Sequence, residues 1–227
     1  MRTGVRGHLV FDNTVKMISD EFHKWYENER VWENTEWLGV PMWKLPFDAF
    51  IMQELICKVR PNVLIETGSG FGGSSVFYAS IMQMINHGKV ITIDVDIKKQ
   101  RMYRCLSIDV LERIHVIEGS STREDVLYNL EKHLLAHYTN MVVLDSWHSY
   151  DHVLEEMRKY EKYVSKDSYM VVEDTHVNGH PVEWKHGKGP YEAVETFLEE
   201  NDDFVIDEDC EKYKMTFNPK GYLRRVK

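Results

Sequence analysis

The chain has 227 residues, of which 43% are hydrophobic and 29% are charged, as is usual for a globular protein with a hydrophobic core. Its formal net charge is −9, and no run of Lys and Arg concentrates positive charge. The sequence therefore argues against a nucleic-acid-binding protein. Three separated cysteines without a Cys-x-x-Cys pair exclude a disulfide framework and a zinc knuckle, and they indicate a reducing compartment.

No segment of the sequence has the character of a membrane span. Near the start, the apolar run Leu9-Val10-Phe11 is too short for the core of a signal peptide. No apolar stretch of about 18 residues occurs anywhere else. We therefore expect a cytoplasmic protein that makes no contact with a membrane.

Residues 1–60 are predicted to form an N-terminal segment in front of a domain at 61–227. Helices are expected at about Asn13–Asn28 and Pro46–Lys58, on either side of an aromatic stretch from Trp32 to Trp43. Two interpretations of this stretch remain open. It could pack on the sheet or on a second subunit, or it could cover a substrate pocket as a lid.

From residue 61 onward, short apolar runs alternate with longer helical patterns, which is typical of βαβ units and a parallel sheet. The predicted strands are Val63–Glu66, Val90–Asp94, Ile114–Glu118, Met141–Asp145 and Tyr169–Glu173. The predicted helices are Ser74–His87, with Ser74 as its N-cap, roughly Lys98–Glu112, Thr122–His137 and His152–Val164.

The C-terminal part follows a different pattern. After a helix at Pro190–Asn201, two strands are predicted at Phe204–Asp207 and Lys214–Asn218. Strands so close in sequence can pair only antiparallel, because a parallel return needs about a dozen residues or more. A mostly parallel α/β sheet of seven strands with a C-terminal antiparallel hairpin and helices on both faces is the Rossmann-like plan of class I methyltransferases.

A glycine-rich loop follows the first predicted strand of the domain. Gly68, Gly70 and Gly73 fit Gly-x-Gly-x-x-Gly between a strand and a helix, where backbone N–H groups and the helix N-terminus favour a negative group. That group could be a pyrophosphate or the carboxylate of a methionine moiety. Asp94, 21 residues after Gly73, is placed to accept hydrogen bonds from both ribose hydroxyls of an adenosine cofactor.

Other side chains near the loop are candidates for cofactor contact. Glu66, at the end of the first strand, could bind an ammonium group or could hydrogen-bond the loop backbone. Ser120 and Ser121 follow the third strand, where an adenine would lie, although they could equally cap a helix. The predicted cofactor-binding residues are Glu66, Gly68, Ser69, Gly70, Gly73, Ser74, Asp94, Ser120, Ser121 and Asp145.

Three carboxylates are predicted at the ends of neighbouring strands. Asp145 ends the fourth strand, and Glu173 and Asp174 follow the fifth, at the edge where open α/β sheets bind ligands. Three acids that converge there would repel one another without a cation. Because all the ligands are oxygens, we expect Mg²⁺ or another hard divalent cation.

His148 follows Asp145 by three residues. A histidine beside a metal-bound hydroxyl can accept its proton, although His148 could instead cap the following helix. The residues predicted to be catalytic are His148, as the base, and Asp145, as the next candidate.

As a whole, the sequence resembles the cephalosporin hydroxylase / rhamnosyl O-methyltransferase family from about Asn34 to Lys227. The resemblance depends on several long strings. They are Asn34-Thr-Glu-Trp-Leu-Gly-Val-Pro-Met-Trp-Lys-Leu-Pro, Ile65-Glu-Thr-Gly-Ser, Glu118-Gly-Ser-Ser-Thr, Leu144-Asp-Ser-Trp-His-Ser, Val172-Glu-Asp-Thr-His-Val-Asn-Gly-His-Pro and Thr216-Phe-Asn-Pro-Lys-Gly-Tyr-Leu-Arg-Arg.

This resemblance implies S-adenosylmethionine as methyl donor, S-adenosylhomocysteine as product, and Mg²⁺ held by Asp145, Glu173 and Asp174. We therefore predict an O-methyltransferase that acts on a hydroxyl of a sugar, a glycoside or another small metabolite, and that assembles as a homo-oligomer. Two alternatives remain: an NAD-dependent oxidoreductase, which the loop and Asp94 would also suit, and a non-catalytic cofactor-binding protein.

Overall fold

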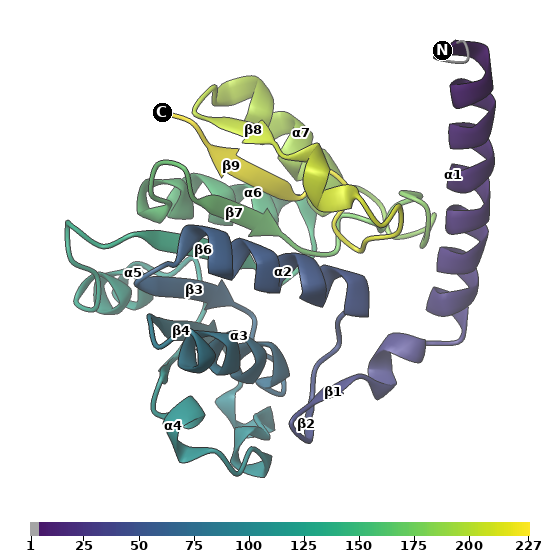
Figure 1. Cartoon of the computed structure of the whole chain (residues 1–227). Coiled ribbons are helices and arrows are strands. Elements are labelled where there is room, and N and C mark those ends of the chain that lie inside the picture. The colour runs from purple at the N-terminus through teal and green to yellow at the C-terminus, as the bar shows by residue number, and fades with distance from the viewer. Residues whose placement is uncertain (1–4) are drawn as a thin grey trace.

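The computed structural model describes residues 5–227 and contains one seven-stranded sheet between two layers of helices (Figure 1). The sheet has the order β5-β4-β3-β6-β7-β9-β8. Its parallel strands are β3 (Val63–Thr67), β4 (Lys89–Asp94), β5 (Ile114–Glu118), β6 (Asn140–Leu144) and β7 (Tyr169–Val172). The prediction of five parallel strands is confirmed.

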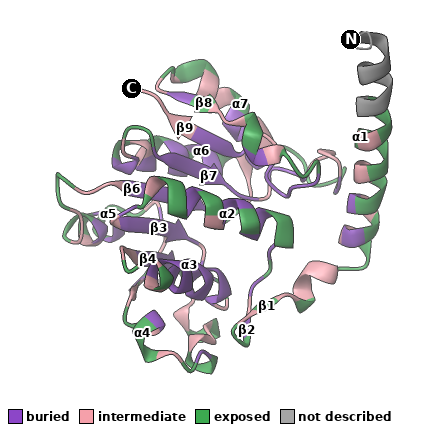
Figure 2. Ribbon diagram, viewed as in Figure 1, coloured by how far each residue is buried: buried purple, intermediate pink, exposed green. Residues whose placement is uncertain are grey.

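Alternate residues of the buried strands face two separate hydrophobic cores. Leu64 packs with α2 (Pro46–Val59) and α3 (Gly73–Met84), whereas Val63 and Ile65 pack with the opposite layer. That layer contains α5 (Glu124–Glu131), α6 (Tyr150–Tyr160) and α7 (Pro190–Glu200). Figure 2 shows the buried sheet between the two layers. Strands that are buried on both faces consist mostly of apolar residues, which is why these strands could be recognised as apolar runs in the sequence.

The order in which the parallel strands are added to the sheet reverses at β3. The strands β4 and β5 are added on one side of β3, and β6 and β7 on the other. The carboxyl ends of β3 and β6 therefore lie side by side at a topological switch point, the usual place for a ligand in an open α/β sheet.

The antiparallel C-terminal pair is present, but the second predicted strand was wrongly placed. The pair is β8 (Phe204–Ile206) and β9 (Tyr222–Arg225), and β9 lies between β7 and β8. The predicted strand Lys214–Asn218 is instead a loop after the 3₁₀ turn η5 (Glu208–Glu211).

The predicted helix Lys98–Glu112 was also wrong. The region contains only the 3₁₀ turns η2 (Ile97–Lys99) and η3 (Met102–Arg104) and the short α4 (Ile108–Leu111). The Arg101 guanidinium donates to the carbonyl oxygens of Lys98, Lys99 and Gln100, which a continuous helix would use for its own N–H groups. Ser74 is not the N-cap of α3, because Gly72 holds that position.

The N-terminal segment begins with α1 (Val5–Asn28), which stands at one side of the molecule (Figure 1). The 3₁₀ turn η1 (Val31–Asn34) and the two-stranded pair β1 (Glu36–Trp37) and β2 (Val40–Pro41) connect it to α2. The predicted segment 1–60 includes residues 1–4, which lie outside the described residues. Among residues 5–227, no helix has the length and apolarity to span a bilayer.

Candidate active site

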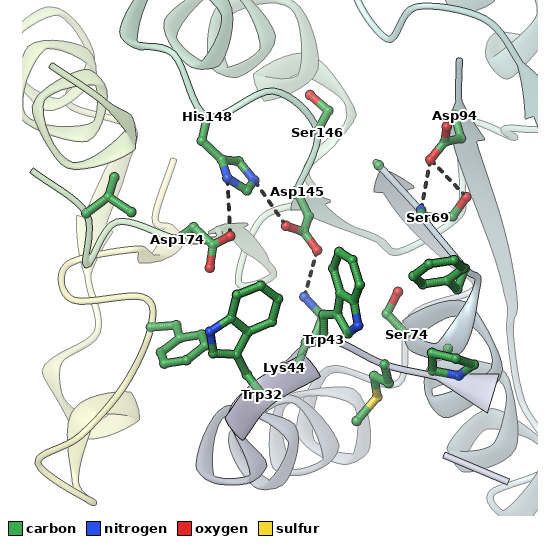
Figure 3. A pocket seen from close by; sticks show the side chains of 18 of the residues that line it. Trp32, Trp43, Lys44, Ser69, Ser74, Asp94, Asp145, Ser146, His148 and Asp174 are labelled. Carbon is green, nitrogen blue, oxygen red and sulfur yellow. Dashed lines mark hydrogen bonds and ion pairs between the residues drawn. The ribbon is translucent and has the colours of Figure 1, made fainter. Parts of the chain in front are cut away.

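A cavity of about 560 Å³ lies at the carboxyl ends of β3, β4, β6 and β7. It extends from the glycine loop, past the carboxylates of the sheet edge, to α1 and the loop after β7. Figure 3 shows the side chains around it. The predicted site residues that line it are Gly68, Ser69, Gly70, Gly73, Ser74, Asp94, Asp145, His148 and Asp174.

The glycine loop is held close to the end of β6. The φ of Gly68 is +80°, and a Cβ there would lie 1.9 Å from the carbonyl oxygen of Asp145. Only glycine permits both the left-handed conformation and this approach. The backbone of Asp145, the first predicted metal ligand, therefore lies directly against the predicted cofactor loop.

Asp94 closes the other side of the loop. Its carboxylate accepts hydrogen bonds from the backbone N–H of Gly70 and of Asp96, each at 2.8 Å. The hydroxyl of Ser69 lies 3.4 Å from the same carboxylate. Asp94 thus stands at the end of β4, within reach of any ligand on the loop.

Three predicted cofactor contacts lie outside the lining of this cavity. Glu66 is fully buried and accepts hydrogen bonds from the hydroxyls of Ser75 and Thr92, while its Oε1 has no hydrogen-bond partner. Ser121 lies 3.4 Å from Nε2 of His152, and Ser120 lies 3.5 Å from the hydroxyl of Thr122. Their predicted contacts with a cofactor stay predictions.

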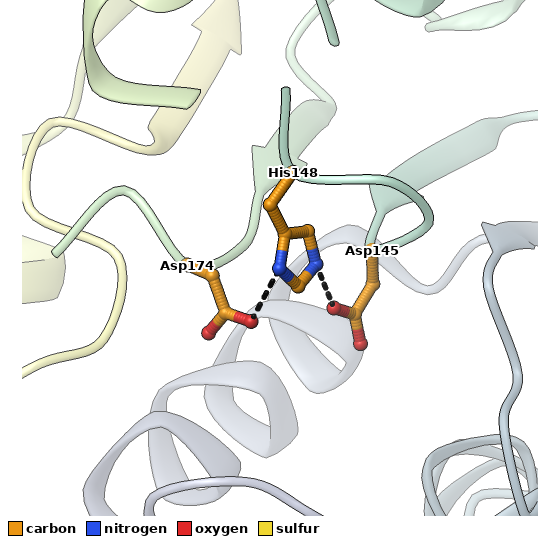
Figure 4. Close-up of side chains that lie close together, drawn as sticks. All are labelled: Asp145, His148 and Asp174. Atoms are coloured by element: carbon orange, nitrogen blue, oxygen red, sulfur yellow. Dashed lines mark ion pairs between the residues drawn. The ribbon is translucent and has the colours of Figure 1, made fainter. Parts of the chain in front are cut away.

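The predicted metal residues do not all meet in one cluster. Asp145, His148 and Asp174 each offer a ligand atom, and these atoms lie within 4.8 Å of one another. The imidazole stands between the two carboxylates, with Nε2 at 3.4 Å from Asp145 and Nδ1 at 3.3 Å from Asp174 (Figure 4). Glu173 is buried beside this cluster without being part of it.

A buried lysine that the sequence did not indicate holds Glu173. The Lys44 ammonium lies 2.9 Å from Glu173 and 2.9 Å from Asp145, and its side chain is only 5% exposed. Burial alone would lower the pKa of Lys44, but the two carboxylates raise it well above its usual value. Lys44 therefore neutralises part of the negative charge that the three acids bring together.

The pKa values of Asp145, Asp174 and His148 are shifted in different directions by their surroundings. Burial opposes ionisation of Asp145, but Lys44 and His148 lower its pKa below the usual value. Burial raises the pKa of Asp174 to about 7 despite the nearby His148. Burial would lower the pKa of His148, but Asp174 and Asp145 raise it to about 9.

This donor set suits a hard divalent cation. Two carboxylates and an imidazole converge, and Nε2 of His148 is buried without a hydrogen-bond partner. Carboxylate oxygens are the ligands that Mg²⁺ prefers, and a bound cation would offset their mutual repulsion. The residues present therefore fit the metal that the sequence predicted, with Asp145 and Asp174 facing each other across His148.

The side chains of the aromatic stretch divide between the cavity and the body of the protein, and the role of the stretch as a lid or a subunit contact stays a prediction. Trp32 and Trp43 line the cavity and meet edge to face, with ring centroids 5.3 Å apart. Trp37 instead packs on Phe77, and its Nε1 donates to the hydroxyl of Ser80. The stretch is therefore part cavity wall and part contact with α3.

Comparison with known proteins places the chain in a family. The sequence profile of the rhamnosyl O-methyltransferase/CmcI family matches residues 29–226. The chain belongs to this family. It is 37% identical over 213 residues to the rhamnosyl O-methyltransferase of Mycobacterium tuberculosis, covering 92% of this chain and 85% of that protein. It is 36% identical over 216 residues to that of Mycobacterium leprae, covering 92% and 90%.

Solved structures agree with the fold. An apo structure of CmcI superimposes with a TM-score of 0.65 and 18% identity, covering 86% of this chain and 77% of that one. A CmcI structure described as containing Mg and SAM gives a TM-score of 0.64 and 17% identity, covering 86% and 78%. The O-methyltransferase TomG of Streptomyces achromogenes, solved with SAM, gives 0.57 and 18%, covering 80% of each chain. The predicted class I methyltransferase fold, family and enzyme class are confirmed.

Proposed function

We propose that this chain transfers the methyl group of S-adenosylmethionine to a hydroxyl of a sugar-containing small molecule, with Mg²⁺ as its metal. The supporting observation is that the glycine loop, Asp94 and the cluster of Asp145, His148 and Asp174 line one cavity. Rhamnosyl relatives and structures described with SAM and Mg support the same substrate, donor and metal.

The donor would lie along the glycine loop. The N–H groups of the loop and the start of α3 favour the donor's carboxylate, and Asp94 would accept hydrogen bonds from its ribose hydroxyls. In the structure Asp94 already accepts a hydrogen bond from the Gly70 N–H, so it would hold the loop and the ribose together. Glu66 with the donor's ammonium, and Ser120 and Ser121 with its adenine, complete the proposed donor site.

The metal would be held by Asp145 and Asp174, with Glu173 as the third proposed ligand. When bound there, Mg²⁺ makes a substrate hydroxyl more acidic and fixes the position of its oxygen. His148, which lies between Asp145 and Asp174, would accept the hydroxyl's proton in its neutral form, which a cation held by these acids would favour by lowering the imidazole pKa. If His148 does not serve as the base, Asp145 is the next candidate, as its carboxylate faces the same space.

The decisive experiment measures methyl transfer to rhamnosides with and without a chelator. Turnover should disappear in excess chelator, while donor affinity by calorimetry stays nearly constant because the loop and Asp94 bind the donor separately. His148→Ala should lower kcat by roughly 10²–10⁴-fold, the usual effect of removing a general base. His137→Ala removes an exposed histidine outside the cavity and should leave kcat unchanged.

Two results would count against this function. One is full activity in excess chelator, and the other is a product without the mass gain of one methyl group. A His148→Ala enzyme of normal rate would contradict only the assignment of the base. The proposal also includes three further points. The chain divides at residue 60, the protein is cytoplasmic, and it binds no nucleic acid.

A further inference from the structure

A second cavity of about 620 Å³ adjoins the first. Glu27, Trp32 and Glu183 line both cavities, so these side chains stand at the junction between them. The second cavity lies between the end of α1 and the loop 181–184. Of its lining residues, Trp32 alone belongs to a segment that the sequence indicates for the site, as part of a possible lid.

An exposed tryptophan forms one wall of the second cavity. The indole of Trp184 lies over Gly179, where a Cβ would be 2.5 Å from the ring. Gly179 has a φ of +92°, so glycine suits both the backbone and the ring packed on it. Trp184 is nevertheless 73% exposed. A large apolar ring that is fixed on one side and exposed on the other is suited to stacking against a ligand ring.

Two carboxylates at the junction are available to accept hydrogen bonds. The Glu27 side chain is 15% exposed, with Nε2 of His176 at 3.9 Å and the side chain of Trp32 beside it. Lys24 and Arg30 also line the second cavity, but each is paired with an acid of its own, Lys24 with Glu21 and Arg30 with Glu33. Glu27 and Glu183 thus present acceptor oxygens to the cavities.

The size of the first cavity is that of a site for one drug-sized ligand. A volume of 560 Å³ is within the range that one drug-sized ligand fills. The donor on the glycine loop would occupy much of this volume and leave room for about one sugar ring beside Asp145 and His148. A further part of the acceptor can continue through the junction into the second cavity, since Glu27, Trp32 and Glu183 line both.

We infer that the second cavity binds the group attached to the methylated sugar, so that the acceptor is a glycoside with a second, uncharged ring. Trp184 and Trp32 would contact that ring, and Glu27 and Glu183 would accept hydrogen bonds from sugar hydroxyls at the junction. A nucleoside diphosphate sugar would bring its phosphates against these two carboxylates, which disfavours it. The inference depends on the proposed function for the position of the methylated sugar.

The test compares methyl rhamnoside, para-nitrophenyl rhamnoside and a nucleoside diphosphate rhamnose as acceptors and as ligands of the S-adenosylhomocysteine-bound protein. The para-nitrophenyl glycoside should have a KM and a Kd at least about tenfold lower than those of the methyl glycoside. Trp184→Ala should remove this advantage, and Glu27→Gln should raise KM for both glycosides. Neither change should alter kcat or the donor Kd, because neither side chain contacts the loop or the base.

Two matched variants control for general effects. Glu29→Gln makes the same charge change two residues after Glu27, and Tyr128→Ala removes an exposed aromatic ring of α5. Neither residue lines either cavity, so both variants should behave as wild type.

Equal affinity for the two glycosides, an unchanged ratio in Trp184→Ala, or preference for the nucleotide sugar would overturn the inference. Methyl transfer without discrimination would contradict the second cavity's role and leave the proposed function intact. Absence of methyl transfer would contradict the proposed function, while calorimetry would still decide whether Trp184 selects an extended glycoside.

Discussion

Lys44 connects the N-terminal segment to the carboxylates at the ends of β6 and β7. Its ammonium reaches Asp145, 101 residues away in sequence, as well as Glu173. Buried ion pairs are costly unless the charges are matched, so this lysine and the acids require one another. A lysine in an aromatic stretch is usually exposed, and no local pattern distinguishes Lys44. The sequence therefore predicted the three acids but not the buried lysine between Asp145 and Glu173.

The donor site makes a prediction for Asp94. Asp94→Ala should weaken binding of S-adenosylmethionine by roughly 1–3 kcal/mol, because the carboxylate's hydrogen bonds to the ribose would be lost. Calorimetry measures this effect. The matched variant is Asp96→Ala, since Asp96 pairs with Lys99 and its side chain is 39% exposed. Donor affinity that is equal in Asp94→Ala and wild type would show that Asp94 does not hold the ribose.

At the scale of elements, the sequence predicts what depends on local composition. The strands β3, β6 and β7 are buried at every position, and an uninterrupted apolar run gives such a strand a clear signal. The loop 214–218 has no comparable local cause. Asp48 of α2 holds it by accepting hydrogen bonds from the Thr216 hydroxyl and the Phe217 N–H. Contacts between residues so far apart in sequence form only in the completed fold. The segment was therefore mistaken for a strand from its residue types alone.

The contact between the glycine loop and β6 predicts different effects for two similar substitutions. Gly68→Ala places a methyl group 1.9 Å from the Asp145 carbonyl oxygen, whereas a Cβ on Gly70 meets no atom within 4 Å. Gly68→Ala must therefore displace the loop or the end of β6, and it should weaken donor and Mg²⁺ binding together. Gly70→Ala carries only the strain of its left-handed φ.

The measurement is calorimetric titration of each variant with S-adenosylhomocysteine and with Mg²⁺. Gly68→Ala should lose at least about tenfold in both affinities, and Gly70→Ala should lose less in donor affinity and nothing in Mg²⁺ affinity. If Gly68→Ala bound Mg²⁺ normally, the loop would not position Asp145.

At the scale of the whole molecule, α1 is apolar on two sides. His23 and Tyr26 are buried and pack on Phe217 of the main body. The adjoining side exposes a stripe of large apolar side chains: Met17 at 61%, Ile18 at 61%, Phe22 at 47% and Trp25 at 51%. Helices that are apolar on both sides are normally covered on both. By sequence alone, the apolar and Arg-rich segment Tyr222–Arg225 also predicts a subunit contact, but Tyr222 and Leu223 are fully buried inside the sheet.

The exposed stripe of α1 leads to the last prediction, that the chain is a homo-oligomer in which α1 contacts a second copy. Phe22 and Trp25 stack with ring centroids 5.5 Å apart, and aromatic side chains contribute strongly to subunit interfaces. Phe22→Glu with Trp25→Glu should therefore dissociate the oligomer without lowering the unfolding temperature of the subunit. The matched variant Met84→Glu changes a side chain of α3 that is 86% exposed, and it should keep the wild-type mass. Light scattering at micromolar concentration measures the mass of all three proteins. A monomeric wild type, or an oligomer that survives both glutamates, would contradict the prediction, because the stripe would then have no role in assembly.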